Sequence, residues 1–155
     1  MLALHVAICF VALLAGAIVL IAFCGARRQP FWELVLLLST VIISLTGFVL
    51  SSPPGTPTPD PARILGVMEL AVVVIAALAR GRRGTYVVSM VLAVYFNAFV
   101  AVTQAFQKIS FLHALAPTGK EPAFLAAQLL TLGLFAALAV AAIRHLPSRA
   151  AAAAT

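Results

Sequence analysis

Five apolar runs, each about as long as a bilayer is thick, constrain this chain more than any other feature of its sequence. They cover residues 2–24, 31–50, 62–79, 85–106 and 123–143. A helix needs about 20 apolar residues to cross the hydrocarbon core of a membrane, within a range of about 17 to 25. The runs therefore predict an all-α integral membrane bundle of five transmembrane helices. Residues 1–146 form its single domain, and residues 147–155 form a short tail.

The composition agrees with this fold class. Hydrophobic residues make up 64% of the 155 residues and charged residues only 9%, whereas charged residues make up roughly 25% of an ordinary soluble domain. The formal net charge is +6, but the ten basic residues stand in short groups between the apolar runs. A nucleic-acid surface would need them gathered on one solvated face. The sequence thus argues against a nucleic-acid partner and predicts that the partner is a lipid bilayer.

The positions of the basic residues predict how the bundle is oriented. Cytoplasmic loops of membrane proteins are enriched in Lys and Arg. The segments after the first, third and fifth runs hold seven of the ten basic residues: Arg27, Arg28, Arg80, Arg82, Arg83, Arg144 and Arg149. The remaining two connections hold Arg63, Lys108 and Lys120. We therefore expect the N-terminus outside and the C-terminal tail in the cytoplasm. The first run lacks a preceding basic region and is too long for a typical signal peptide, so we expect it to remain as a helix.

Glu69 is the polar residue that most demands an explanation. It lies seven residues into the third run, about 10 Å deep at 1.5 Å per residue. A carboxyl group at that depth must stay protonated, pair with a cation or meet water. Lys108 is the best-placed cation and Arg63 the next. Alternatively, Glu69 hydrogen-bonds Asn97 or Gln128 and only holds the helices together.

The fourth run carries a polar stripe at a similar depth. At 100° per residue, Asn97, Gln104 and Lys108 fall within about 60° of one another on one helical face, whereas Phe99 and Phe106 point elsewhere. This pattern is typical of a helix whose narrow, polar face looks into a bundle.

These residues together predict a polar pocket in the outer half of the bilayer, which would serve as a ligand or proton site. Its predicted lining is Glu69, Asn97, Gln104, Gln128 and His5, with Lys108 and His113 above it. The segment after Phe106 reads either as a loop that lies on the membrane or caps the bundle, or as an extension of the fourth helix to about Leu115.

Two further predictions concern packing. Glu33, near the cytoplasmic end of the second run, is expected to reach toward the headgroup interface. Small residues allow helices to approach closely in lipid, which we expect at Gly16, Gly47, Gly66 and Gly133.

Known enzyme motifs and metal sites are not indicated. The chain has no Walker loop, zincin motif, nucleophile elbow or GxGxxG segment, so familiar enzyme chemistries lack a sequence basis. Cys9 and Cys24 lie about 22 Å apart along one helix and have no metal-binding spacing. A haem held by His5 and His113 is disfavoured, because no second histidine lies deep within a run.

Two stretches resemble known proteins of undefined function. The first helices, "LHVAICFVALLAGAIVLIA" and "LLLSTVIISLTGFVL", and the segment "QAFQKISFLHALAPTGKEPAF" are similar to parts of uncharacterised small bacterial multi-spanning inner-membrane proteins. The resemblance implies a location in the cytoplasmic (inner) membrane and no known reaction.

The sequence therefore favours a non-enzymatic polytopic membrane protein. It would act as an accessory subunit in a membrane-protein complex or homo-oligomer, or as a binder of a small ligand. The alternative is a small transporter or proton-coupled carrier that uses Glu69. A third possibility is a redox protein of the membrane that carries haem or quinone.

Overall fold

The computed structural model describes residues 2–50 and 61–146, and all regular structure in these residues is helical. The elements are α1 (Leu2–Cys24), α2 (Pro30–Leu50), α3 (Pro61–Leu78), the short 3-10 helix η1 (Ala79–Gly81), α4 (Arg83–Lys108), α5 (Ser110–Leu115) and α6 (Pro122–His145). Five of these helices are long and apolar enough to cross a membrane, which confirms the predicted helical class and the number of long helices. The predicted tail, 147–155, lies outside the described residues.

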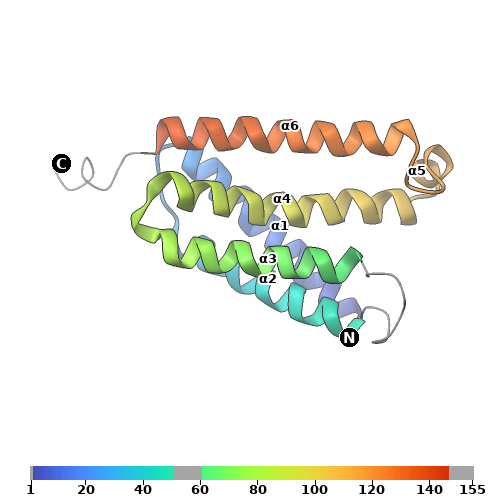
Figure 1. Cartoon of the computed structure of the whole chain (residues 1–155), viewed down its shortest axis with the longest axis horizontal. Helices are drawn as coiled ribbons and strands as arrows, with labels where there is room; N and C mark the ends of the chain where they lie inside the picture. The colour runs from blue at the N-terminus through green and yellow to red at the C-terminus, as the bar shows by residue number, and fades with distance from the viewer. Residues whose placement is uncertain (1, 51–60, 147–155) are drawn as a thin grey trace.

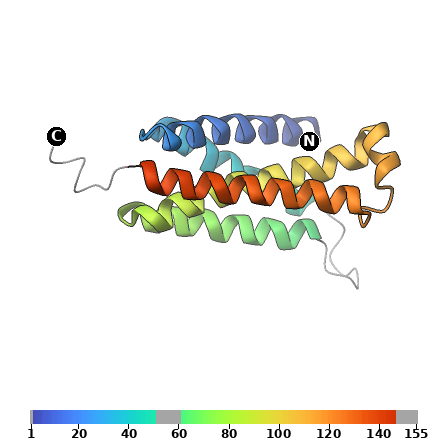
Figure 2. The ribbon, with the colours of Figure 1, turned by 90° about the horizontal axis from the view of Figure 1, so that it is seen from above.

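The five long helices lie side by side in one bundle with α4 at its centre (Figure 1). α4 contacts α1, α2, α3 and α6, while α2 packs between α1 and α3. In Figure 1, α6 lies on the opposite side of α4 from α2 and α3, and Figure 2 shows α1 and α6 as neighbours. This order makes α6 a peripheral helix that rests on α4 and partly on α1.

The two ends of the bundle differ in charge. At one end α1 and α6 finish, α2 begins, and η1 joins α3 to α4. We call this the arginine end, because its described basic residues are Arg27, Arg28, Arg80, Arg82, Arg83 and Arg144. At the other end, the α5 end, α4 stops at Lys108 and α5 begins after Ile109, whose extended backbone (φ −89°, ψ 115°) interrupts the helix. The fourth helix therefore does not continue to Leu115, and α5 is a separate helix at the end of α4 (Figure 1).

The turn between α5 and α6 is organised by Glu121. Its carboxylate accepts hydrogen bonds from the Thr118 amide (3.0 Å), the Thr118 hydroxyl (2.8 Å) and the Lys120 amide (2.9 Å). Desolvation opposes ionisation of this group, but the hydrogen bonds outweigh it and lower the pKa of Glu121 to about 2. Pro122 then opens α6 at a position where a missing amide hydrogen costs nothing.

The predicted close approaches at glycine are confirmed at two positions. A Cβ atom on Gly16 would lie 2.6 Å from Val94 Cγ1, so α1 meets α4 at this point. A Cβ atom on Gly66 would lie 3.3 Å from the ring of Phe48, where α3 meets α2. The same prediction is wrong at Gly47 and Gly133, because a Cβ atom there would meet nothing within 4 Å.

Candidate functional site

Glu69 is buried at the contact of α3 with α2, with 3% of its surface exposed. The hydroxyl of Ser44 on α2 donates a hydrogen bond of 2.7 Å to Glu69 Oε2. Lys108 is exposed at the last position of α4 and forms no ion pair with Glu69 in the described structure. Glu69 therefore has a neutral partner, and the predicted partners Asn97 and Gln128 bind elsewhere.

Asn97 joins α4 to α2. Its side-chain amide donates to the Thr40 hydroxyl at 3.2 Å and to the Ala93 carbonyl of its own helix at 2.9 Å. Thr40 and Ser44 are four residues apart and therefore lie on one face of α2. One row of hydroxyl groups on α2 thus forms hydrogen bonds with Asn97 of α4 and with Glu69 of α3.

His5 joins α1 to α2 through its ring nitrogen Nδ1, which lies 2.7 Å from the hydroxyl of Thr46. That hydroxyl donates its proton to the Ile42 carbonyl at 2.7 Å. His113 is exposed on α5 and belongs to another part of the bundle. Among the described residues, no three His, Cys, Asp or Glu side chains gather as a metal site would require.

Gln128 is the buried polar residue of α6, with 9% of its surface exposed. Its amide nitrogen donates to the Thr103 hydroxyl (3.1 Å) and to the Phe99 carbonyl (3.3 Å) of α4. Its carbonyl oxygen Oε1 is buried and has no hydrogen-bond partner in the described structure. The α4–α6 contact therefore satisfies only one side of this amide.

The polar stripe of α4 faces the bundle over its inner half only. Asn97 and the positions that continue its face toward the arginine end (Tyr86, Met90 and Ala93) are buried, whereas Gln104 and Lys108 are exposed. Beyond Asn97 the helix packs against α6 through the face formed by Phe99, Thr103 and Phe106, and the Phe106 ring lies 5.4 Å from that of Phe124. The prediction that Gln104 lines the interior is wrong, because the face of α4 that packs on α6 at this level carries Phe99, Thr103 and Phe106, and Gln104 lies outside that contact.

The predicted site residues are hydrogen-bonded in separate pairs rather than to one another. The described hydrogen bonds place them at four different contacts: α1 with α2, α2 with α3, α2 with α4, and α4 with α6. Each pair removes a polar group from apolar surroundings, as helices in lipid require.

Glu33 forms a polar cluster that the sequence did not reveal. It is 4% exposed, so the predicted reach toward the interface is wrong. Its carboxylate accepts hydrogen bonds from Arg28 Nε (3.1 Å), Arg28 Nη2 (2.5 Å), the Tyr86 hydroxyl (2.6 Å) and the Gln29 amide (3.3 Å). These bonds join the α1–α2 connection, the start of α2 and the start of α4.

The geometry of Arg28 shows how local structure builds this cluster. The chain leaves α1 through Ala26, whose positive φ of 58° is rare for a residue with a side chain, and Arg28 then lies beside the first turn of α2. Its guanidinium carbon stands 4.4 Å from the centre of the Tyr86 ring, a cation–π contact. The hydrogen bonds with Glu33 raise the pKa of Arg28 above its ordinary value, against the effect of partial burial. The only feature of the sequence that could have indicated this ion pair was the spacing of five residues between Arg28 and Glu33.

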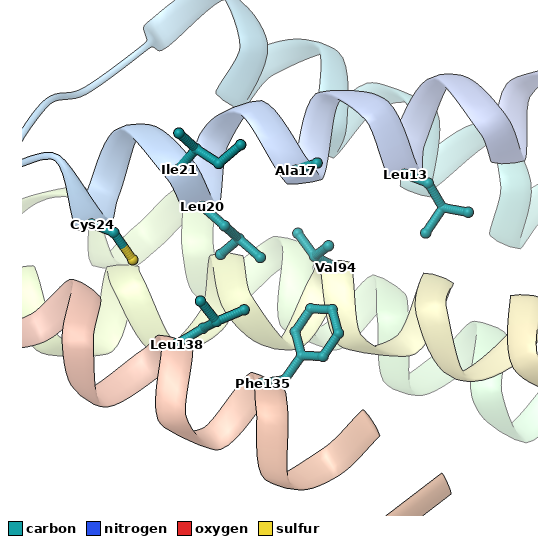
Figure 3. A pocket seen from close by; sticks show the side chains of 8 residues that line it. All are labelled: Leu13, Ala17, Leu20, Ile21, Cys24, Val94, Phe135 and Leu138. Carbon is teal, nitrogen blue, oxygen red and sulfur yellow. The ribbon is translucent and has the colours of Figure 1, made fainter. Parts of the chain in front are cut away.

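An open, apolar hollow lies between α1 and α6 (Figure 3). Its volume is about 490 Å³, within the range of ligand pockets. Its walls are Leu13, Ala17, Leu20, Ile21 and Cys24 of α1, Val94 of α4, and Phe135 and Leu138 of α6. Apart from the thiol of Cys24, no wall side chain carries a polar atom. We call this hollow the α1–α6 groove.

Comparison of the chain with protein-family models, with curated proteins and with solved structures gives no match.

Proposed function

We propose that this chain is a multi-pass integral protein of the cytoplasmic membrane, with its arginine end in the cytoplasm and its N-terminus outside. The long helices turn large apolar side chains outward, among them Ile21, Leu78 (82% exposed) and Leu130. Contiguous apolar surface of this kind is unfavourable in water and suits a lipid environment. The arginine-rich end fits the side on which membrane proteins carry their basic residues.

The orientation can be tested with cysteines placed at the two ends. Arg80→Cys and Lys120→Cys are introduced separately after Cys9 and Cys24 have been replaced by serine. A membrane-impermeant maleimide added to intact cells should label Lys120→Cys and spare Arg80→Cys until the cells are opened. The reverse pattern would contradict the proposed orientation.

Within this setting, the proposed function is non-enzymatic binding of an apolar chain in the α1–α6 groove. The groove itself carries this proposal, because it is a hollow with apolar walls beside a helix that buries very little of its surface. The polar residues, by contrast, are engaged at separate helix contacts. An accessory role in a larger complex is compatible with such a binding protein.

A variant that fills the groove tests this function. Ala17 lines the groove and is exposed, so Ala17→Phe should fit without disturbing the core. Native mass spectrometry of the protein in a mild detergent, with phosphatidylcholine as probe, should show one fewer bound lipid for Ala17→Phe than for the original chain. Ala137→Phe, at an exposed position of α6 outside the groove, is the matched control and should bind as the original does. Equal binding by all three proteins would refute the proposal.

Glu69 supports a second candidate function, that of a small proton-coupled carrier. Its buried carboxyl group is bonded to a hydroxyl, which can donate to a carboxylate or accept from a carboxylic acid. The site is therefore compatible with both protonation states. For a carrier, Glu69→Gln should abolish proton uptake into vesicles driven by a pH gradient while stability in detergent stays the same. Unchanged uptake would remove Glu69 from this role.

A further inference from the structure

The length of α4 determines where the α5 end lies relative to a bilayer. α4 has 26 residues, which span about 39 Å at 1.5 Å per residue. The hydrocarbon core of a bilayer is about 30 Å thick, and the bilayer with its headgroups is about 40–45 Å thick. If Arg83 begins α4 among the headgroups on one side, Lys108 ends it among the headgroups on the other side. The segment that follows α4 therefore starts at the level of the lipid headgroups.

The exposed side chains of α4 change character at the same level. Beyond its first turn, α4 exposes the apolar residues Val88 and Leu92. Near its end it exposes Gln104, Gln107 and Lys108 instead. Gln104 lies about 32 Å from the start of the helix at 1.5 Å per residue. Exposed polar residues thus begin where the hydrocarbon core would end, which agrees with the depth given by the length of α4.

Apolar side chains return in α5, directly after this polar stretch. Phe111 is 71% exposed and Leu115 is 47% exposed, and no residue of α5 is buried. The principal contact of α5 within the chain is with α4. Phe111 and Leu115 therefore form an apolar surface, at the level of the lipid headgroups, that the described part of the chain leaves uncovered.

The direction and the two faces of α5 suit a helix that lies in the plane of the membrane. The extended backbone of Ile109 ends α4, and α5 then runs across the direction of the long helices (Figures 1 and 2). At 100° per residue, Phe111 and Leu115 are about 40° apart, whereas His113 is about 160° from each of them. An interfacial helix buries its apolar face at the boundary between headgroups and acyl chains and turns its polar face to water.

We infer that α5 is an interfacial anchor, in which Phe111 and Leu115 insert among the lipids of the leaflet at the α5 end while His113 faces water. The partner of this surface is the lipid bilayer. Lys108, two residues before α5, is exposed and carries a charge that lipid phosphates attract. The inference rests on the proposed membrane location and adds to it a contact that fixes the depth of α4 and α6 in the bilayer.

Single tryptophans can report the surroundings of each face of α5. Trp32→Phe first removes the one tryptophan of the chain. In this background Phe111→Trp is compared with His113→Trp, the matched control on the opposite face of the same helix. The full chain is reconstituted in phosphatidylcholine vesicles whose acyl chains carry bromine near the glycerol. Bromine should quench the fluorescence of Phe111→Trp more than that of His113→Trp. Iodide in the water on both sides of the membrane should have the opposite order of effect.

A third variant separates this inference from the membrane location on which it rests. Leu130→Trp replaces a residue of α6 that is 75% exposed and lies within a candidate span, so bromine should quench it in any membrane-spanning arrangement of the bundle. Quenching of Leu130→Trp with an equal or reversed order for Phe111→Trp and His113→Trp would overturn the inference alone. Absence of bromine quenching in all three variants would overturn both.

A protein partner on α5 would give a different pattern. Phe111→Trp would then be shielded from bromine and from iodide alike, which would overturn the inference while leaving the membrane location intact. Unchanged circular dichroism and elution volume establish that each variant is folded.

Discussion

Helices α2 and α6 are similar in length and apolar character but differ in how they are used. α2 has 21 residues and α6 has 24. α2 buries seven residues, including Glu33, Thr40 and Ser44, whereas α6 buries only Gln128 and Ala142. The polar residues of α2 bond α1, α3 and α4, while the buried polar residue of α6 bonds α4 alone. Polar contacts, more than apolar content, thus distinguish α2 from the peripheral helix α6.

This difference suggests a division of roles. The contacts of α2 hold α1, α3 and α4 in register, because each polar pair forms in only one alignment of the helices. α6 lacks a comparable set of contacts and leaves space beside α1. Changes on α2 should therefore affect stability, and changes around α6 should affect binding.

The largest effect is expected at Glu33. Glu33→Gln removes the negative charge that Arg28 and Tyr86 share. Breaking a fully buried ion pair costs about 3–5 kcal/mol, and the cost is lower here because the Arg28 side chain is 37% exposed. We expect a loss of about 2 kcal/mol in the free energy of unfolding, measured by chemical unfolding in detergent micelles. Tyr86→Phe removes a single hydrogen bond and should cost about 1 kcal/mol. Equal stability of Glu33→Gln and the original chain would contradict a central role for α2.

Substituting alanine for one glycine in a helix contact and for another on the peripheral helix compares how tightly the two regions are packed. Gly16→Ala would push a methyl group against the stiff side chain of Val94, and overpacking of this kind costs about 1–3 kcal/mol. Gly133→Ala on α6 meets open space and should gain up to about 1 kcal/mol from helix propensity. Thermal unfolding of both variants should therefore shift in opposite directions. A higher unfolding temperature for Gly16→Ala as well would show that α1 can move away from α4.

The sequence predicted the long helices well, because length and hydropathy are properties of each helix taken alone. The predicted runs 31–50 and 85–106 correspond to α2 (Pro30–Leu50) and α4 (Arg83–Lys108). The helical period also identified the inner half of the buried face of α4, through Asn97.

The hydrogen-bond partners could not be predicted, because they depend on which helices are neighbours and on how each is rotated. Glu69 accepts a hydrogen bond from Ser44 and does not pair with Lys108, because α3 packs on α2 at that level and Lys108 lies at the end of α4. Gln104 is exposed because α4 packs on α6 at this level through Thr103 and Phe106, and Gln104 lies outside that contact. The α1–α6 groove has no sequence signature, since its walls are ordinary apolar residues.

Ser44 should show a smaller effect than Glu33. Ser44→Ala removes the hydroxyl that binds Glu69, and a buried acceptor without a donor costs about 1–3 kcal/mol in soluble proteins and less between helices in lipid. We expect a loss of about 1 kcal/mol in unfolding free energy. Ser89→Ala is the control, because the Ser89 hydroxyl bonds only the Thr85 carbonyl of its own helix. A loss in Ser89→Ala as large as that in Ser44→Ala would argue against a specific α2–α3 contact.

The carboxyl group of Glu121 should make the stability of the turn before α6 depend on pH. Its pKa in the folded chain is about 2, below the ordinary value of 4.5. The hydrogen bonds of the ionised group therefore stabilise the turn above about pH 4.5, and this stabilisation is lost as the pH falls toward 2. The protection of the Thr118 and Lys120 amides from exchange, relative to the intrinsic rate at each pH, should fall over this range, as NMR can show. Glu121→Gln should exchange faster at neutral pH and lose the dependence. A carboxyl titration midpoint near 4.5 would contradict these contacts.

The smallest effect is expected at Gln128, the buried polar residue of the peripheral helix. Gln128→Leu removes two hydrogen bonds to α4, but it also removes a buried carbonyl oxygen that has no partner in the described structure. The Thr103 hydroxyl keeps its bond to the Phe99 carbonyl, so no new unpaired donor is created. The two lost hydrogen bonds, about 1 kcal/mol each, are offset by the relief of one unpaired buried acceptor, about 2 kcal/mol within a range of 1–3. The free energy of unfolding should therefore change by less than about 0.5 kcal/mol. A loss as large as that of Glu33→Gln would mean that α6 is held as firmly as α2, and the contrast between the two helices would fail.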